Sequence, residues 1–360
     1  MRRLEAMEAR PYPIILTSDF SGLKAAINEV ACPSAIMIIT DTHVGPLYLA
    51  TVKEELGEGI PVYDYAFKAG ETSKHLGTIT EIYNALLAVH MDRSGLIIAL
   101  GGGVVGDIAG FVASSYMRGI PFIQIPTTIV AQNDSSMGGK VGVDYLDHKN
   151  MVGAFYNPKL VYTNIRTLGT LPEREFISGL AEVLKHALIK NKAFYDYLLK
   201  EKDKILQQDD RSLIEMTYTS CKAKCEVVEE DAKELGLRKI LNFGHTIGHA
   251  LETESHFNLL HGECVAYGMV MSAYISYGRG YIEASHLKDV ESLCRAYKLL
   301  APFGEYDIHS LLQHILYDKK KAYGKVSFIL LQAIGQACIK NDVTQEEIEE
   351  AILYVRKTCQ

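Results

Sequence analysis

The sequence predicts two domains: an N-terminal α/β domain built on a doubly wound parallel sheet, and a C-terminal domain that is mostly helical. The chain has 360 residues, enough for two domains of ordinary size. Up to about residue 130, short isoleucine-rich runs alternate with helical stretches. From about residue 172, apolar residues recur at helical spacing and strand signals become sparse. We therefore assign the domains to residues 1–170 and 171–360.

Four apolar runs of the first domain have the pattern of buried strands. None alternates apolar with polar residues, as a strand with one solvated face does. Helical stretches such as Gly77–Val89 lie between them, and this order predicts parallel strands with helices on both faces of the sheet. The runs are Ile14–Leu16, Ala35–Thr40, Leu96–Leu100 and Phe122–Ile125.

The second domain is expected to consist mainly of helices, with Val326–Leu331 as its clearest strand. Asn157-Pro158 and Leu171-Pro172 interrupt regular structure before it begins, because proline disfavours helical conformation in the preceding residue. The segments with helical spacing are Arg174–Leu188, Ser212–Val228, Gly244–Glu254 and Gly262–Tyr277.

Composition and charge exclude several classes of protein. The 37 basic residues are outnumbered by 44 acidic ones, whereas a nucleic-acid-binding protein needs a basic surplus to neutralise phosphates. The longest apolar stretch, Leu96 to Gly106, is far shorter than the ~20 residues that span a membrane. Residues 1–10 contain no apolar run of a signal peptide, and the seven cysteines are scattered. We expect a cytoplasmic protein that binds neither nucleic acid nor membrane.

A glycine-rich turn directly follows one of the expected buried strands. Gly101, Gly103 and Gly106 match the spacing G-x-G-x-x-G, which lets a backbone approach a pyrophosphate at a helix N-terminus. No acidic residue follows about 20 residues later, as the standard dinucleotide fingerprint requires. Asp41, at the end of an earlier strand, is an alternative partner for a ribose hydroxyl. The competing interpretation of the glycine motif is a tight turn that allows close helix packing and binds no nucleotide.

A polar segment, Gln132–Lys140, has the composition of a loop, and His148-Lys149-Asn150 follows it. Together they offer a carboxylate, two hydroxyls, two lysines and flexible glycines, and Arg118 lies just upstream. Lysines beside glycines suit a phosphorylated or acidic substrate. A solvated surface loop without a ligand is the alternative.

A set of possible metal ligands lies in the second domain. His245 and His249 are four residues apart on one helix face, and His261 follows beside a glycine. Glu182 lies on an earlier helix. Two histidines and one carboxylate are a familiar ligand set for a catalytic zinc ion, although such histidine pairs also occur without a metal.

Cations and amides in the same half of the chain could hold an acidic ligand. Arg238 and Asn242 lie within seven residues of His245, so they could face the same pocket and bind a carboxylate or phosphate. Lys224 and the Lys319-Lys320 pair are further candidates, although each could equally be a solvated surface charge.

These motifs, in this order, resemble the 3-dehydroquinate synthase family of sugar-phosphate cyclases. The resemblance runs from about Asp41 to Gly335. It implies a Rossmann-like NAD-binding α/β domain, a mostly helical metal-binding domain and an active site in the cleft between them. The most specific stretches are Gly101–Gly110, Asp134–Tyr156, Gly179–His186, Asn242–Glu252 and His261–Met271.

The resemblance also implies roles for individual residues. The metal ligands are Glu182, His245 and His261, usually with zinc and sometimes with cobalt. The positions that match NAD-binding residues are Asp41, Glu71, Lys74, Gly102, Gly103, Val104, Asp107, Thr127, Thr128, Lys140 and Lys149. The positions that match substrate-binding or catalytic residues are Asp134, Lys140, Lys149, Asn150, Lys185, Lys224, Arg238, Asn242, His249 and the Lys319-Lys320 pair, of which Lys320 is the expected member. The residue matching Arg118 reaches the neighbouring subunit's site, which implies a homodimer.

The family reaction converts 3-deoxy-D-arabino-heptulosonate 7-phosphate to 3-dehydroquinate and phosphate, in the shikimate pathway. It proceeds by NAD-dependent oxidation, phosphate elimination, reduction and intramolecular aldol closure, so the cofactor is recycled. We expect Lys140, Lys149, Asn150 and His249 near the phosphate, and no single side chain stands out as the base. The substrate carboxylate is expected to lie against Arg238, Asn242 and Lys224.

Two departures keep alternatives open. Where the family has Gly-Gly-Lys-Thr-Gly-(Val/Ile)-Asn, this chain has Val141 in place of the threonine and Asp144 in place of the asparagine. A sister cyclase of the amino-dehydroquinate or 2-deoxy-scyllo-inosose type is therefore an alternative. An NAD- and metal-dependent polyol dehydrogenase is a further one, although it needs no phosphate-binding lysines. A catalytically silent binding protein is disfavoured because the ligand positions and the glycine turn are intact.

Overall fold

The computed structural model describes residues 1–7, 11–146, 148–231, 234, 236–256, 258–321 and 326–359, with the side chains of 316–321 excluded. Two compact units are present. The first comprises Met1–Leu171 and Leu213–Cys225, and the second comprises Pro172–Ser212 and Glu226–Gln360. Helix α7 (Asp210–Glu230) therefore contributes its middle part to the first unit. Within the described residues, no helix is long and apolar enough to cross a membrane.

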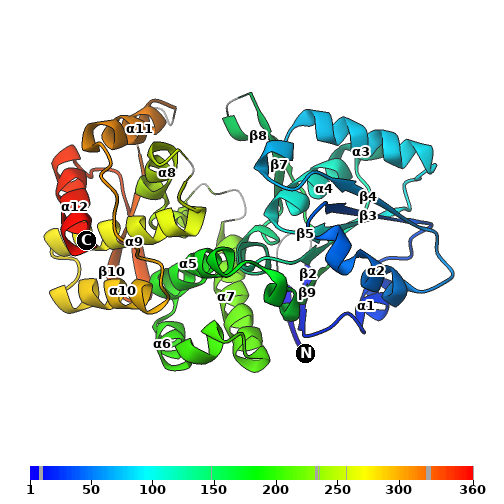
Figure 1. Cartoon of the computed structure of the whole chain (residues 1–360), viewed down its shortest axis with the longest axis horizontal. Helices are drawn as coiled ribbons and strands as arrows, with labels where there is room; N and C mark the ends of the chain where they lie inside the picture. The colour runs from blue at the N-terminus through cyan, green and yellow to red at the C-terminus, as the bar shows by residue number, and fades with distance from the viewer. Residues whose placement is uncertain are drawn as a thin grey trace. The chain divides into compact units, whose positions relative to one another are not determined.

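The first unit is built on a seven-stranded sheet of order β1-β2-β9-β6-β5-β3-β4, whose strands fan out in Figure 1. All neighbouring strands are parallel except β1, which pairs antiparallel with β2. The expected parallel sheet and its four buried strands are therefore confirmed. The strands are β1 (Arg2–Ala6), β2 (Tyr12–Thr17), β3 (Ile36–Asp41), β4 (Val62–Phe67), β5 (Leu96–Gly101), β6 (Phe122–Pro126) and β9 (Val161–Asn164).

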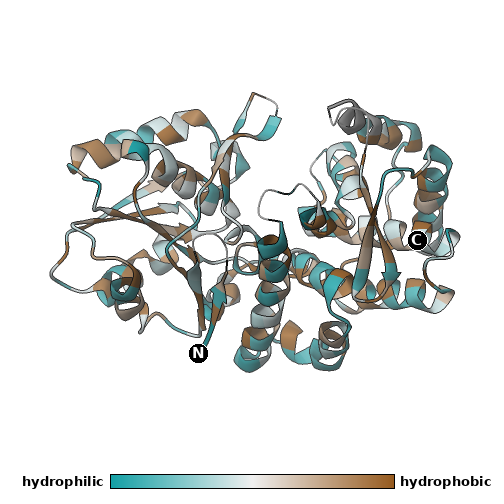
Figure 2. Ribbon diagram, turned by 180° about the vertical axis from the view of Figure 1, so that it is seen from behind, coloured by the Kyte–Doolittle hydropathy of each residue, from teal (hydrophilic) through white to brown (hydrophobic). Residues whose placement is uncertain are grey.

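Helices cover both faces of this sheet, as a doubly wound fold requires. One face packs against α1 (Leu23–Val30) and α2 (Gly45–Leu56), and the other against α3 (Leu76–Ala88) and α4 (Gly103–Ser115). Figure 2 shows the strands mostly in hydrophobic colours and the outer helices in mixed colours. Burial of both faces explains why β2, β3, β5 and β6 are apolar runs without polar alternation, whereas the edge strands β1 and β4 carry exposed residues.

The segment expected to be a loop, Gln132–Lys140, is more ordered than its composition indicates. A π-helix, η3 (Ala131–Ser135), occupies its first part. Gln132 is fully buried and its amide donates to the carbonyls of Pro126 and Asn164 and to the Thr167 hydroxyl. The hairpin of β7 (Lys140–Tyr145) and β8 (His148–Phe155) follows. The prediction of a loop was wrong for this part of the segment, because the buried Gln132 side chain hydrogen-bonds it to the ends of β6 and β9.

The second unit consists mainly of helices, as expected, together with the hairpin β10–β11. Helix α9 lies among α5, α8, α10, α12 and β10, and residues on all its sides are buried, which explains its nearly continuous apolar sequence. The elements are α5 (Glu173–Lys190), α6 (Lys192–Leu206), η5 (Leu237–Asn242), α8 (His245–Glu254), α9 (His261–Gly278), α10 (Ala284–Ala296), α11 (Ile308–Lys321), β10 (Phe328–Ala333), β11 (Gln336–Lys340) and α12 (Gln345–Thr358).

Candidate active site

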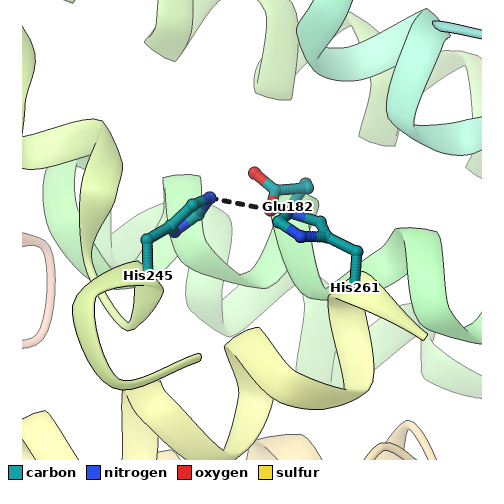
Figure 3. Close-up of side chains that lie close together, drawn as sticks. All are labelled: Glu182, His245 and His261. Atoms are coloured by element: carbon teal, nitrogen blue, oxygen red, sulfur yellow. Dashed lines mark ion pairs between the residues drawn. The ribbon is translucent and has the colours of Figure 1, made fainter. Parts of the chain in front are cut away.

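Three side chains of the second unit converge on one point (Figure 3): Glu182 from the middle of α5, His245 at the start of α8 and His261 at the start of α9. The Nε2 atoms of His245 and His261 lie 3.5 and 3.4 Å from Oε1 of Glu182. Ligand atoms about 2.0–2.1 Å from a tetrahedral metal are separated by about 3.4 Å. That carboxylate oxygen is buried and faces both imidazole nitrogens. The three side chains thus fit a divalent metal.

Glycines allow the three helices to approach closely enough for this convergence. A Cβ added at Gly262, next to His261, would lie 1.8 Å from the backbone oxygen of Ser178 on α5, one turn before Glu182. A Cβ at Gly268 would lie 1.9 Å from the backbone oxygen of Gly244, which precedes His245. Gly244 itself has φ +81, a conformation that L side chains rarely adopt. The glycines that flank the histidines therefore set the geometry of the cluster.

The charges of the cluster are strongly coupled. Burial opposes a charge on Glu182, but its ion-pair partner Lys185 and the two histidines outweigh burial and hold the pKa of Glu182 well below its usual range. Burial, with the positive charge of Lys185, lowers the pKa of His245 to about 3. Burial also opposes a charge on His261, but hydrogen bonds to Glu182 and Glu252 prevail and raise the pKa of His261 to about 9. At neutral pH the metal-free chain thus holds a proton on His261.

Metal affinity is expected to increase as the pH rises from 7 to 9. A metal ion must displace the proton of His261 below its pKa of about 9, so each unit of lower pH weakens apparent binding by about tenfold. Above pH 9 this dependence ends, because the imidazole is then already neutral. Competition with a coloured chelator at several pH values measures the effect. Equal affinities at pH 7 and pH 9 would contradict a protonated His261.

Glu252, which was not among the candidates predicted from the sequence, contacts the ring nitrogen of His261 that faces away from Glu182. Its Oε2 lies 3.5 Å from Nδ1 of His261, while Nε2 of the same ring faces Glu182. A carboxylate at the second nitrogen of a metal-binding histidine fixes the tautomer and the orientation of the ring. The sequence signal was its place on α8, seven residues after His245 and on the same face of the helix.

Replacing Glu252 by glutamine is expected to weaken metal affinity by about tenfold, and replacing it by alanine by up to about 100-fold. Both variants lose the charge that orients His261. Dialysis against graded chelator, followed by measurement of bound metal, tests this. E254Q is the matched control, because Glu254 lies on the same helix and its Oε2 pairs with Nε2 of His314 at 3.4 Å. An E252A chain that binds metal as tightly as E254Q would refute the role of Glu252.

In the first unit, the candidate nucleotide residues gather where the connections of the sheet change direction. From β3 the chain passes through α2 to β4 on one side, and from β5 it passes through α4 to β6 on the other. Ligands of open α/β sheets bind at this switch point, outside the carboxyl ends of the strands. Asp41 ends β3, and its Oδ1 accepts the backbone N–H groups of His43 and Val44, each at 2.8 Å.

The glycine turn after β5 is consistent with both interpretations of its sequence, close helix packing and phosphate binding. Gly101 and Gly106 allow close packing, since added Cβ atoms would lie 2.5 Å from Val105 and 2.7 Å from Gln124. Gly102 is the N-cap residue of α4 and has no side chain to cap the helix. A Cβ at this position would lie 3.1 Å from Thr128. The helix N-terminus that begins at Gly103 and Val104 therefore suits a phosphate.

A buried hydroxyl beside this turn also fits a bound nucleotide. Thr127 donates its backbone N–H to the Gly101 carbonyl at 3.0 Å, which places Thr127 and Thr128 next to the glycines. The Thr127 hydroxyl is buried and has no hydrogen-bond partner among the described residues. Its oxygen and the uncapped helix N-terminus fit the polar groups of a dinucleotide.

Lys74 joins the nucleotide candidates to a substrate candidate. Its ammonium lies 2.7 Å from Asp107 on α4 and 3.9 Å from Glu71, and it donates to the Asn150 side-chain oxygen at 2.5 Å. Burial opposes this charge, but Asp107 above all outweighs burial, and the pKa of Lys74 is raised. Burial raises the pKa of Asp107 to about 6 against the opposing effect of Lys74.

The remaining substrate candidates of the first unit lie on α7, the π-helix and the hairpin. Lys224 of α7 is buried and donates to the backbone and side-chain oxygens of Asp134, at 2.6 and 2.7 Å. Lys140 begins β7 and Lys149 lies on β8, and both are exposed. Arg118 is exposed in a turn where it and Met117 both have positive φ.

The second unit carries the other candidates. Lys185 is buried against Glu182, and the ring of His249 lies 5.3 Å from that of His245 between centroids. Arg238 is buried and Asn242 donates to Glu234 at 3.0 Å, both on η5 directly before α8. The side chains of Lys319 and Lys320 lie outside the described residues.

The structure explains one departure from the family motif and gives the other a role. Val141 is buried and faces α4, where its Cγ1 would lie 2.4 Å from a Cβ at Gly110. The absence of a threonine hydroxyl at this position therefore affects the packing of the core. Asp144 accepts the backbone N–H of Asn150 at 2.6 Å.

Comparisons with known proteins agree with this geometry. The family description "3-dehydroquinate synthase N-terminal" matches residues 64–178, and "3-dehydroquinate synthase C-terminal" matches residues 179–321. The 3-dehydroquinate synthase of Acetivibrio thermocellus is 44% identical over 349 residues, 96% of this chain and 97% of that protein.

Two solved structures resemble the chain over nearly its full length. The 2-epi-5-epi-valiolone synthase of Streptomyces hygroscopicus, with NAD+ and Zn2+ bound, has a TM-score of 0.89 at 28% identity, covering 99% of this chain and 100% of that one. A 2-deoxy-scyllo-inosose synthase complexed with carbaglucose-6-phosphate, NAD+ and Co2+ has a TM-score of 0.88 at 26% identity, with the same coverage.

Proposed function

The chain belongs to the 3-dehydroquinate synthase family and has the lyase activity of that family, and we propose how its own residues carry the reaction. In this reaction 3-deoxy-D-arabino-heptulosonate 7-phosphate is converted to 3-dehydroquinate and phosphate, a step of aromatic amino acid biosynthesis. The observation that carries the proposal is the convergence of Glu182, His245 and His261 beside the buried Lys185. The 3-dehydroquinate synthase of Acetivibrio thermocellus, 44% identical to the chain, supports this substrate over those of the sister cyclases.

We assign the metal to Glu182, His245 and His261, and zinc is the ion this ligand set favours, with cobalt as a substitute. NAD is assigned to the first unit and the metal to the second, and we propose residues 1–170 and 171–360 as the corresponding domains. When bound, the metal lowers the pKa of a substrate hydroxyl and NAD accepts and returns a hydride. The solved relatives that hold NAD+ with Zn2+ or Co2+ support both assignments.

The cations of the chain bind and orient the two acidic groups of the substrate. Lys140, Lys149 and Asn150 of the hairpin, with His249, are assigned to the phosphate. Arg238, Asn242 and Lys224 are assigned to the carboxylate, where a buried guanidinium gives a bidentate contact. Asp134 holds the Lys224 ammonium at 2.7 Å and so orients it. The buried Lys185 side chain pairs with Glu182 and balances its charge.

We also propose that the enzyme is a cytoplasmic homodimer in which Arg118 serves the neighbouring subunit's site. Met117 and Arg118 are held in the left-handed region, a strain that proteins retain mainly at functional positions. Large apolar side chains, among them Met117, Met151 and Phe155, are exposed on this turn and on β8. Sedimentation at several concentrations tests the dimer, and a 40.0 kDa species throughout would refute it.

Substrate selection distinguishes this activity from that of a sister cyclase. The carboxylate substrate is expected to exceed a hexose 6-phosphate without a carboxylate in kcat/KM by roughly 1,000-fold or more, because buried polar groups built for one ligand are left unpaired by another. The R238L variant is expected to lose most of this preference by raising KM for the acid. Faster phosphate release from the hexose 6-phosphate would assign the chain to the sister cyclases, and net NADH without phosphate would indicate a dehydrogenase.

A further inference from the structure

A closed ring of contacts in the first unit joins three residues from two separate segments. The backbone N–H of Asp144 on β7 donates to the Lys74 carbonyl at 2.8 Å. The Asp144 carboxylate accepts the backbone N–H of Asn150 on β8 at 2.6 Å. The Asn150 side-chain oxygen accepts from the Lys74 ammonium at 2.5 Å, which closes the ring.

The ring connects the two groups of residues assigned to NAD and to the substrate. Lys74 reaches Asp107, which lies on the helix that begins at the glycine turn. Asn150 lies beside Lys149 on the hairpin assigned to the substrate phosphate. Lys74 is buried, whereas Asn150 is exposed, so the ring holds an exposed side chain against a buried charge.

Asn150 needs such support because of its backbone conformation. Its φ is +54, in the left-handed region that asparagine tolerates better than most residues but that still costs free energy. The Asp144 carboxylate satisfies the N–H of this residue and so stabilises the conformation. A charged acceptor forms a stronger hydrogen bond to a backbone N–H than a neutral one does.

We propose that Asp144 is a positioning residue that holds Asn150 for the substrate phosphate and Lys74 for the nucleotide, so that the two sites are coupled. The proposal rests on the proposed function of this site. Asp144 acts through Asn150 and touches no reacting atom in this account. The position is one where the chain departs from the family motif, and the carboxylate makes the ring stronger than an amide would.

The coupling is tested with D144A and D144N in the full-length, metal-loaded enzyme. D144A is expected to raise KM for the phosphorylated substrate by about tenfold with kcat changed less than threefold. D144N keeps an oxygen that can accept the Asn150 N–H and is expected to restore most of the loss. D92A is the matched control, because Asp92 likewise accepts a backbone N–H, from Ser94 at 2.8 Å, without belonging to the ring.

A double-mutant cycle decides whether Asp144 acts through Asn150. If it does, D144A added to N150A produces no further increase in KM, whereas independent effects multiply. Multiplicative effects, or a D144A enzyme that behaves like D92A, would overturn the proposal.

The affinity for NAD, measured by calorimetry without substrate, reports on the ring even if the substrate assignment is wrong. D144A is expected to weaken NAD binding by about threefold, because Asn150 is no longer held where its side-chain oxygen accepts from Lys74, and D144N to restore it. Wild-type enzyme that binds NAD but does not turn over the acid would refute the proposed function alone. Unchanged NAD affinity in D144A would refute the coupling alone.

Discussion

Replacing His261 by alanine is expected to abolish metal retention and to lower kcat/KM by roughly 1,000-fold or more. A metal ion that polarises a substrate oxygen supplies several kcal/mol of transition-state stabilisation, and about 4 kcal/mol corresponds to that factor. His261 is partly exposed, so the variant is expected to remain folded. Metal analysis after gel filtration, together with phosphate release, measures both effects.

H309A is the control for this experiment, because His309 is an exposed histidine of the same unit, on α11. It should retain metal and activity. E182A is expected to lose metal as well and to lose about 3–5 kcal/mol of stability, because it leaves the buried ammonium of Lys185 without its partner. An H261A chain with a full complement of metal would show that the ligands have been misassigned.

Replacing Gly262 by alanine is expected to destabilise the chain by about 3 kcal/mol and to weaken metal binding at the same time. The new Cβ would lie 1.8 Å from the backbone oxygen of Ser178, so α9 must move away from α5. Overpacking of this kind costs about 1–3 kcal/mol, and contact with backbone rather than a flexible side chain places the change at the upper end. The movement separates His261 from Glu182.

G278A is the matched control, since Gly278 ends the same helix and has open space around its Cβ position. It is expected to change stability by less than about 0.5 kcal/mol. Urea denaturation of the metal-free chains, followed by metal titration, separates the two effects. A G262A chain with the stability and metal affinity of G278A would contradict the packing argument.

Much of the fold follows from local sequence pattern. Buried parallel strands must be apolar on both faces, and the runs at Leu96–Leu100 and Phe122–Ile125 show this directly. Helices α5, α8 and α9 of the second unit follow equally from apolar spacing. The packing of Leu213–Cys225 with the first unit does not, because it depends on contacts with residues such as Tyr12 and Met137 that are distant in sequence.

The candidate site was predictable where ligand-type residues and their characteristic spacing occur within one short segment of sequence. Glycines beside His245 and His261 suggested a metal, and the same glycines prove to set the helix contacts. Glu252 was missed because its partner lies on another helix, and an acidic residue on a helix surface is common. The ring through Asp144 was missed for the same reason, since the Lys74 segment and the hairpin meet only in the folded chain.

The number of phosphate ions released per NAD tests the central claim most directly. Zinc-loaded protein is given 3-deoxy-D-arabino-heptulosonate 7-phosphate and a trace of NAD well below the enzyme concentration. An enzyme that oxidises, eliminates, reduces and closes the ring within one site is expected to release many phosphate ions per NAD with no net NADH. Stoichiometric NADH without phosphate, or no phosphate release from enzyme that holds both metal and NAD, would contradict this account.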